Sequence, residues 1–468
     1  MGQSILCAAL PSGIAWEVRS TGNDSNGGGF VTGASGTDYS QQDGAQFSGT
    51  NLAVDGTTNT KVSSAAHNFA ATDVGNLIHI TAGTGWTSGF YEIVSVASNE
   101  ATLDRSPAAV GTTGGTWAEG GALATPGAVL SNGNAAQTNS SRIFLKYAAT
   151  PYAITTSLVW STGGSGLGIW LIGYNAARSD AFAPGYAHRP TIQIASGNAG
   201  ITMLSGPAYN ATAYNLILDC NNQAGSVGAS LSTYSYVYNV LAKSCDSSGI
   251  IATNVMDSEV TGLTANAGFG IAVVTSAVRN SVHDSAGASG FGALQVYNSA
   301  IGTFFDGNLI YNLNASTGCA TCDGIRPYIN DVVAHNTIYA VSRDGIRGSN
   351  YNMQAIYDNL IVSAATAGID YVPGSAGPKS PFIDGNCFYG NGTNVLDDTM
   401  AGVPYTYLYN VADGANNLNN TAAADFRLKA ASGCAAAGQL PVPGVTAGVA
   451  SFGAAGRILP QASSGGAQ

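Results

Sequence analysis

The sequence predicts an all-β protein whose main part is a solenoid with coils of about 22 residues. Three observations support this prediction: a glycine followed by an apolar residue recurs at a nearly constant spacing, asparagines recur in a second column, and charge is scarce. Only 9% of the residues are charged, yet 45% are hydrophobic and 22 are Tyr. A disordered chain would also lack apolar residues, so this chain is expected to fold, with many turns.

The first column is a glycine followed by Ile or Ala. Its members are Gly228-Ala229, Gly249-Ile250, Gly270-Ile271, Gly292-Ala293, Gly324-Ile325, Gly345-Ile346 and Gly368-Ile369. The spacings are 21, 21, 22, 32, 21 and 23 residues. The long interval contains NASTGCATC, which indicates a loop inserted into one coil.

The second column is an asparagine followed, two residues later, by an apolar residue. Its members are Asn215, Asn239, Asn280, Asn308, Asn336, Asn359 and Asn386. One coil, near Thr261-Gly262-Leu263, lacks the asparagine. Alternate side chains of a strand share a face, so the pattern predicts a turn that leads into a strand. Asparagine tolerates the left-handed backbone conformation and can pair with an asparagine stacked above it, which gives the column a structural role.

The repeat contains neither amphipathic helical segments nor a Leu-x-x-Leu-x-Leu frame, so helical and leucine-rich solenoids are rejected. The segments YNLIL, YNVLA, GNLIY, HNTIY, DNLIV and GNCFY, together with the Gly-Ile column, resemble the right-handed parallel β-helix superfamily of pectate lyases, polygalacturonases and phage tailspikes. The resemblance covers about residues 140–400. It implies a right-handed, single-stranded parallel β-helix, and it says little about function.

The flanks suggest four parts: an N-terminal arm at 1–30, a small β module at 31–124, the β-helix at 125–400, and a C-terminal cap and tail at 401–468. Within the module we expect strands at Leu77–Ile80, Tyr91–Val96 and Thr102–Leu103, with a hairpin at Ser98-Asn99. This module and the preceding WEVRSTGNDSNGGGF resemble N-terminal parts of phage virion proteins. DFRLKAASGCAAAG resembles the segment that closes many bacterial and phage β-helices.

Charge and hydropathy exclude some classes of partner. The net charge of -11 leaves no basic face for nucleic acid. No stretch approaches the roughly 20 apolar residues of a membrane span. The opening SILCAALPSG is short for a signal peptide and has no Lys or Arg before it, so Met1 is expected to be the true start of a protein assembled in a cytoplasm.

The cysteines are odd in number and scattered, which argues against a disulfide framework. They are Cys7, Cys220, Cys245, Cys319, Cys322, Cys387 and Cys434. Reduced thiols would fit cytoplasmic assembly. Cys319 and Cys322 form a lone Cys-x-x-Cys without the second pair that a structural zinc site needs, so they are interpreted as turn thiols.

Asp-Gly-Ile-Arg occurs twice, beginning at Asp323 and at Asp344. In consecutive coils Asp323 should stack on Asp344, and Arg326 on Arg347, at about the 4.8 Å strand spacing. The next coil has Asp370 where the arginines stood, which favours a self-neutralising structural ion network. The alternative is a catalytic group formed by these two carboxylates and two arginines.

Carboxylates about 5 Å apart would suit a retaining glycosidase, whereas polygalacturonases of this superfamily invert. They carry Asn-x-Asp, Asp-Asp, Gly-His-Gly and Arg-x-Lys motifs. The centre of the repeat has neither Asp-Asp nor Gly-His-Gly, and Asp397-Asp398 lies beyond it. The acids that a Ca²⁺-dependent lyase would gather are not grouped in the sequence: Asp306, Asp323, Asp344, Asp358 and Asp384. The structural interpretation is therefore preferred.

Tyr311, Tyr339 and Tyr389 each follow a column asparagine by three residues. An outward aromatic column would suit contact with a host glycan, but stacked tyrosines also stabilise sheets, which is the preferred interpretation. His283 and His335 have no Ser or Cys placed against them, so no triad is predicted. No metal and no cofactor is expected.

Two functions of different classes remain. The preferred one, which rests on the resemblances, is a structural bacteriophage virion protein at the virion surface: a spike, fibre or head-decoration protein that docks to other virion proteins through its N-terminal region. The resemblance implies a homotrimer and allows host attachment. The alternative is a polysaccharide depolymerase of the pectate-lyase-like fold, either a hydrolase or a lyase. A secreted adhesin ranks third.

Overall fold

The computed structural model of the protein describes residues 13–130, 141–160, 168–182, 188–206, 210–231, 234–264, 266–288, 290–349, 355–372 and 382–397, and short strands at 406–408, 411–412, 418–420 and 425–428. The chain forms two compact units. One comprises the chain up to Gln193 with Leu204–Leu216, and the other comprises Ile194–Met203 and the chain from Ile217 onward. The apolar opening segment, Cys7, Cys434 and most of the predicted cap at 401–468 lie outside the described residues.

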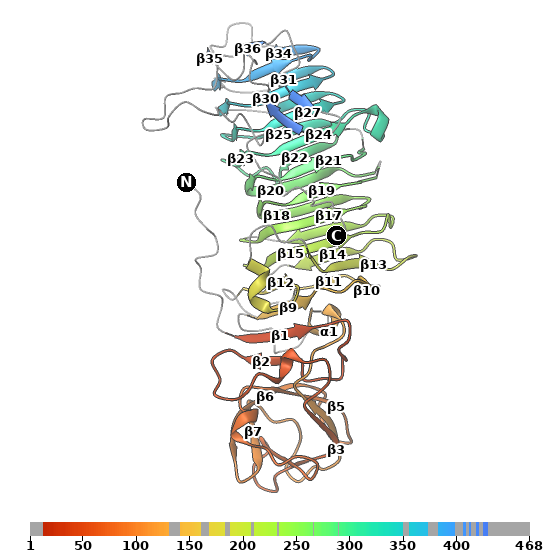
Figure 1. Ribbon diagram of the computed structural model, residues 1–468, viewed down its shortest axis with the longest axis vertical. Helices are drawn as coiled ribbons and strands as arrows, with labels where there is room; N and C mark the ends of the chain where they lie inside the picture. The colour runs from red at the N-terminus through yellow and green to blue at the C-terminus, as the bar shows by residue number, and fades with distance from the viewer. Residues whose placement is uncertain are drawn as a thin grey trace, which may run out of the picture. The chain divides into compact units, whose positions relative to one another are not determined.

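Both units contain coils of a parallel β-solenoid, so the predicted all-β fold class is confirmed (Figure 1). Among the described residues, helix is limited to short pieces: α1 (Pro126–Leu130) and the 3-10 turns η2 (Tyr39–Gln41), η3 (Ala71–Asp73), η5 (Arg178–Phe182) and η6 (Ala315–Thr317). None of the described helices is long and apolar enough to cross a membrane.

In the second unit the stacked coils build three parallel sheets. The first sheet contains β16 (Val227–Leu231), β18 (Ser248–Met256), β20 (Phe269–Val278), β22 (Gly292–Val296), β25 (Asp323–Arg326), β28 (Asp344–Ser349), β31 (Ala367–Val372) and β34 (Thr393–Asp397). The second sheet contains the ends of β18 and β20 and then β23 (Phe304–Asp306), β26 (Val332–Ala334), β29 (Ala355–Tyr357), β32 (Phe382–Asp384) and β35 (Thr406–Leu408).

The third sheet contains β17 (Tyr236–Lys243), β19 (Glu259–Thr261), β21 (Ser281–His283), β24 (Leu309–Leu313), β27 (Thr337–Val341), β30 (Leu360–Ala364), β33 (Cys387–Tyr389) and β36 (Val411–Ala412). A further antiparallel pair follows, β37 (Leu418–Asn420) with β38 (Asp425–Leu428). Each coil therefore runs through the first, second and third sheets in turn.

The first unit also contains solenoid strands. β9 (Arg142–Lys146) pairs in parallel with β12 (Trp170–Tyr174), and β12 pairs with β15 (Thr212–Asp219). β1 (Ile14–Val18) pairs in parallel with β9 and antiparallel with β2 (Gly29–Val31), so the predicted arm contains a strand that joins the sheet. The remaining strands are β10 (Tyr152–Ile154), β11 (Leu158–Val159), β13 (Thr191–Ile194) and β14 (Thr202–Gly206).

A closed antiparallel barrel forms the other part of the first unit. Its strands, in the order β3-β4-β7-β6-β5-β8, are β3 (Phe47–Val54), β4 (Lys61–Ser64), β7 (Glu100–Leu103), β6 (Gly89–Ala97), β5 (Leu77–Ala82) and β8 (Gly115–Glu119). Its interior is a cluster of buried apolar and aromatic side chains that includes Trp117 and Phe69. The predicted hairpin is confirmed, because Ser98 and Asn99 have φ of 54° and 64° between β6 and β7.

The glycine column faces apolar side chains of the third sheet within each coil. A Cβ added to Gly345 would lie 2.4 Å from Ile361 Cγ2, and one added to Gly324 would lie 2.9 Å from Ile338 Cγ2. Glycine therefore leaves room for the apolar residue that follows the asparagine by two places. The predicted alignment of Gly292 is wrong by one residue, because Gly292 pairs with Phe269 and leaves Ala293 in the glycine position.

The expectation of reduced thiols is wrong for the five described cysteines, which are Cys220, Cys245, Cys319, Cys322 and Cys387, because all of them are disulfide-bonded. Cys220 and Cys245 form a disulfide across a sequence separation of 25, with Cα atoms 4.8 Å apart, and Cys319 and Cys322 form a second one. Coil stacking brings residues about one period apart to within strand spacing, which makes the first pairing possible. The odd total number of cysteines carried no information about this local pairing.

Candidate functional site

The two Asp-Gly-Ile-Arg repeats form a ladder of ion pairs on the first sheet. The register stacks Ile325 on Ile346 and Arg347 on Asp370. Asp323 accepts a hydrogen bond of 2.6 Å from Arg326 Nε, and Asp344 accepts one of 3.0 Å from Arg347 Nη1. The repeated motif thus pairs each aspartate with the arginine three residues later.

Arg343 connects the two repeats and was not identified as a site residue from the sequence. Its Nε donates to Asp323 Oδ1 at 2.6 Å and lies 3.4 Å from Asp344 Oδ2. Its only signal in the sequence is its position directly before the second Asp-Gly-Ile-Arg repeat. The first repeat is preceded by Cys322 instead. One guanidinium therefore bridges the carboxylates of two consecutive coils.

Backbone amides close the ladder from the next coil. The Asp344 N–H donates to Asp323 Oδ1 at 3.4 Å, and the Ala367 N–H donates to Asp344 Oδ1 at 3.2 Å. The side chains of Asp323 and Asp344 are 0% exposed, whereas the arginines over them are partly exposed. Burial, reinforced by the charges of Asp323 and Asp370, raises the pKa of Asp344 to about 6. A substrate approaching this ladder would meet guanidinium groups and no exposed carboxylate.

The asparagine column is a continuous hydrogen-bonded ladder from Asn280 to Asn386. Each Nδ2 donates to Oδ1 of the asparagine in the next coil at 2.9–3.1 Å, and each backbone N–H donates to the same oxygen at 2.9–3.1 Å. The five members are fully or almost fully buried: Asn280, Asn308, Asn336, Asn359 and Asn386. The residue before each of them, and not the asparagine, has the left-handed conformation, as at His335 with φ of 54°.

The other two members of the predicted column lie outside this ladder. Asn215 and Asn239 take the left-handed conformation themselves, with φ of 59° and 52°. Ser258 fills the ladder position in the coil that lacks an asparagine: its Oγ accepts the Val240 N–H at 3.2 Å, and its own N–H donates to Asn280 Oδ1 at 2.9 Å. Asn239 therefore stands one residue before the ladder position of its coil. Asn215 Nδ2 donates instead to the Gly173 carbonyl at 2.9 Å.

The structure groups three of the acids that are dispersed in the sequence. His335 Nδ1 lies 2.7 Å from Asp306 Oδ1, and His335 Nε2 lies 3.7 Å from Asp358 Oδ2. Asp384, one coil further on, raises the pKa of Asp358 together with burial, which is the larger cause. These side chains are partly exposed, so here two carboxylates stand on opposite sides of an accessible imidazole.

The tyrosine column is interrupted. Tyr311 pairs with Tyr339 in the register, but Val362 stands between Tyr339 and Tyr389 and is buried. His283 precedes Tyr311 and stacks on it, with ring centroids 4.6 Å apart. Among the described residues of this column, the contiguous tyrosines are thus limited to two coils, and His283 extends the aromatic surface by one coil.

Among the described residues, a metal could be held by His67, Asp73 and Glu119, whose ligand atoms lie within 4.8 Å of one another in the barrel. Neither composition nor repeat pattern pointed to them.

No protein-family model and no curated protein matches the chain. Among solved structures, the chain is similar to a GH87 alpha-1,3-glucanase of Streptomyces thermodiastaticus, at 10% identity and a TM-score of 0.37 over 78% of this chain and 87% of that one. It is similar to pectate lyase Pel9A, at 13% identity and 0.36 over 68% and 88%. It is also similar to ORF18 of Geobacillus virus E2, at 14% identity and 0.29 over 63% and 59%. These likenesses concern the fold alone.

Proposed function

We propose that the chain is a structural protein of a bacteriophage particle, a spike, fibre or head-decoration protein in which the β-solenoid projects from the surface. The observation that carries the proposal is the burial of Asp323 and Asp344 under Arg326, Arg343 and Arg347. The polar side chains of the two repeats tie one coil to the next. The resemblance of the flanks to phage virion proteins supplies the biological setting.

A solenoid held together in this way suits a mechanical role. Each coil contacts only its neighbours, so stability grows with the number of coils. The buried asparagine ladder and the Asp–Arg ladder add polar connections between coils to the hydrogen bonds of the three sheets. We extend the proposal to a homotrimer that docks to other virion proteins through the N-terminal region and contacts host glycan through Tyr311 and Tyr339.

The test is cleavage of host-surface polysaccharides by the purified chain, beside an Asp323→Asn/Asp344→Asn double variant. We expect no cleavage by either protein, and a molar mass of three chains by light scattering. Cleavage by the wild type that disappears in the double variant would contradict the structural function and make the repeats a catalytic pair.

The depolymerase remains the second candidate, and one observation favours it: the partly exposed group of Asp306, His335 and Asp358. In inverting glycosidases the two carboxyls stand about 6.5–9.5 Å apart to admit a water molecule. The imidazole of His335 stands between the carboxylates of Asp306 and Asp358 and keeps them apart. The carboxylates of Asp323 and Asp344, by contrast, both contact the one guanidinium of Arg343. Cleavage that survives the double variant but is lost in Asp306→Asn or Asp358→Asn would establish this function.

A further inference from the structure

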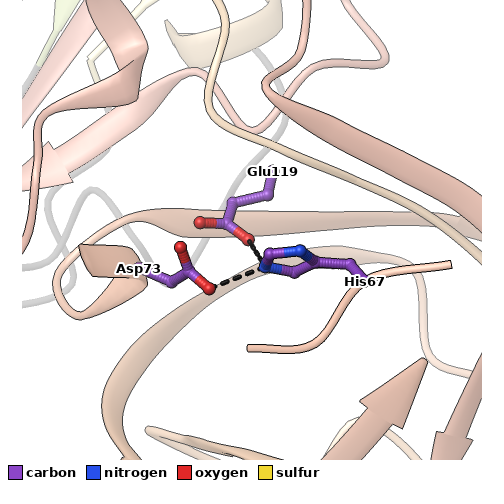
Figure 2. A group of neighbouring side chains, drawn as sticks. All are labelled: His67, Asp73 and Glu119. Carbon is purple, nitrogen blue, oxygen red and sulfur yellow. Dashed lines mark hydrogen bonds and ion pairs between the residues drawn. The ribbon is translucent and has the colours of Figure 1, made fainter. Parts of the chain in front are cut away.

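A buried group of ligand-bearing side chains lies in the barrel of the first unit (Figure 2). His67 lies between β4 and η3, Asp73 ends η3, and Glu119 ends β8. The Nε2 atom of His67 is 2.7 Å from Asp73 Oδ2 and 4.0 Å from Glu119 Oε2. Two carboxylates therefore converge on one imidazole nitrogen.

The carboxylate of Glu119 is buried. Its side chain is 0% exposed, and among the described residues neither of its carboxylate oxygens accepts a hydrogen bond. Asp73, by contrast, accepts the Ala70 N–H at 2.9 Å and a hydrogen bond from Thr72 Oγ1 at 3.3 Å. A buried carboxylate with no donor is costly unless a proton or a cation neutralises it.

The group is held in place by its surroundings. The His67 ring stacks on Phe47, with centroids 3.6 Å apart, and meets the edge of Phe69 at 4.9 Å. The backbone of Glu119 pairs with Phe47 of β3 and with Ile78 of β5. The aromatic contacts hold the imidazole and the strand pairing holds the backbone of Glu119, which favours a preformed site.

We propose that His67, Asp73 and Glu119 bind a zinc ion. Imidazole nitrogen and carboxylate oxygen are common zinc ligands at about 2.0–2.2 Å, and a tetrahedron of that size sets neighbouring ligand atoms roughly 3.3 Å apart. The observed separations from His67 Nε2, 2.7 Å and 4.0 Å, lie on either side of this value. Small opposite movements of the two carboxylates admit the ion, and a water molecule would complete the four ligands.

The donor set selects against the hard cations. Ca²⁺ takes six to eight oxygen ligands and Mg²⁺ prefers an octahedron of oxygens and waters, whereas this group offers an imidazole in an apolar barrel. A divalent transition metal with neutral His67 also balances the two negative charges of Asp73 and Glu119. The bound ion would link the segment before β5 to β8, so the stability of the barrel should depend on it.

The experiment uses the full chain, purified without an affinity tag or chelator from zinc-supplemented medium. Metal content is measured by mass spectrometry for the wild type, for Glu119→Gln and for the control Glu92→Gln, which alters a carboxylate of β6 outside the group. We expect one zinc per chain in the wild type and the control, and its loss in Glu119→Gln. Chelation should lower the melting temperature of the wild type, and added zinc should restore it.

Cobalt provides a readout of the ligand geometry. Co²⁺ added to the chelated wild type should give the intense visible absorption of a tetrahedral site, and Glu119→Gln should not. Because Glu119→Gln removes a buried charge, it is expected to fold, which circular dichroism verifies. Zinc retained in full by Glu119→Gln would assign the metal to another group, such as that of His335, and overturn the proposal. A wild type that neither holds zinc nor responds to it would overturn it too.

Discussion

Removing one rung of the asparagine ladder should destabilise the solenoid far more than removing an exposed asparagine. Asn336 Oδ1 accepts hydrogen bonds from the backbone N–H and from Nδ2 of Asn308, both at 2.9 Å. Its Nδ2 donates to the Phe305 carbonyl at 3.0 Å and to Asn359 Oδ1 at 2.9 Å. Asn336→Ala deletes all four bonds inside a fully buried site.

The loss of unfolding free energy in Asn336→Ala depends on which buried polar groups are left without a hydrogen-bond partner. Asn308 Nδ2 keeps its bond to the Ala277 carbonyl, and Asn359 Oδ1 keeps the bond from the Asn336 N–H. The Asn308 N–H loses the acceptor in the ladder, and an orphaned buried donor costs about 1–3 kcal/mol. The other three lost bonds contribute about 0.5–1.5 kcal/mol each, so we expect the free energy of unfolding to fall by about 2.5–7.5 kcal/mol.

The assay is chemical denaturation followed by far-ultraviolet circular dichroism, with Asn198→Ala as the matched control. Asn198 lies in the same unit, and its Nδ2 donates to the carbonyls of Ala195 and Ser196 at a water-accessible turn. Water can replace those bonds, so the control should lose less than about 1 kcal/mol. Equal midpoints for the two variants would refute the claim that the ladder stabilises the coils.

Two further predictions concern the first sheet. Gly345→Ala should lower the free energy of unfolding by about 1–3 kcal/mol, because the added Cβ would lie 2.4 Å from Ile361 Cγ2. The control is Gly268→Ala, which should melt like the wild type because no atom lies within 4 Å of its added Cβ. Because burial raises the pKa of Asp344 from 3.8 to about 6, the folded protein binds a proton that the unfolded chain releases between these values. The wild type should therefore lose stability relative to Asp344→Asn as the pH rises from about 4 to about 6, and denaturation midpoints that run parallel across this range would contradict the assignment.

The period of the solenoid could be predicted because both columns arise from a steric rule that repeats in every coil. Glycine is needed where an apolar side chain of the third sheet approaches the backbone, as at Gly345 and Ile361. The same rule could not fix the register at Gly292, because alanine at 293 is small enough to occupy the glycine position. Sequence therefore located the repeat to within one residue.

The predicted asparagine column combined residues from two different positions of the coil. A left-handed corner and a buried amide ladder both favour asparagine, and they occupy adjacent positions. Asn239 stands at the corner and Asn336 in the ladder, although each precedes an apolar residue by two places. Nothing in a single sequence separates the two uses, whereas one φ angle and one hydrogen bond do.

Contacts made by residues that do not recur in every coil could not be predicted from the sequence. Arg343 contacts two aspartates, but the equivalent position in the preceding coil holds Cys322. Glu119 meets His67 only because the barrel closes β8 against β3 and β5. Contacts of this kind depend on a particular closure of the chain, and no local pattern of residue types encodes it.

Two buried aspartates of the solenoid contrast with Glu119 of the barrel, and the contrast supports the inference about the barrel. Asp323 accepts hydrogen bonds from Arg326 and Arg343 and from the Asp344 amide, and Asp344 accepts them from Arg347 and from the Ala367 amide. The oxygens of such a carboxylate are hydrogen-bonded within the solenoid, whereas those of Glu119 accept no hydrogen bond among the described residues. Glu119 lies in a barrel without repeats, so no neighbouring copy supplies a donor, and its position beside Asp73 and His67 leaves a cation as the partner that would satisfy all three.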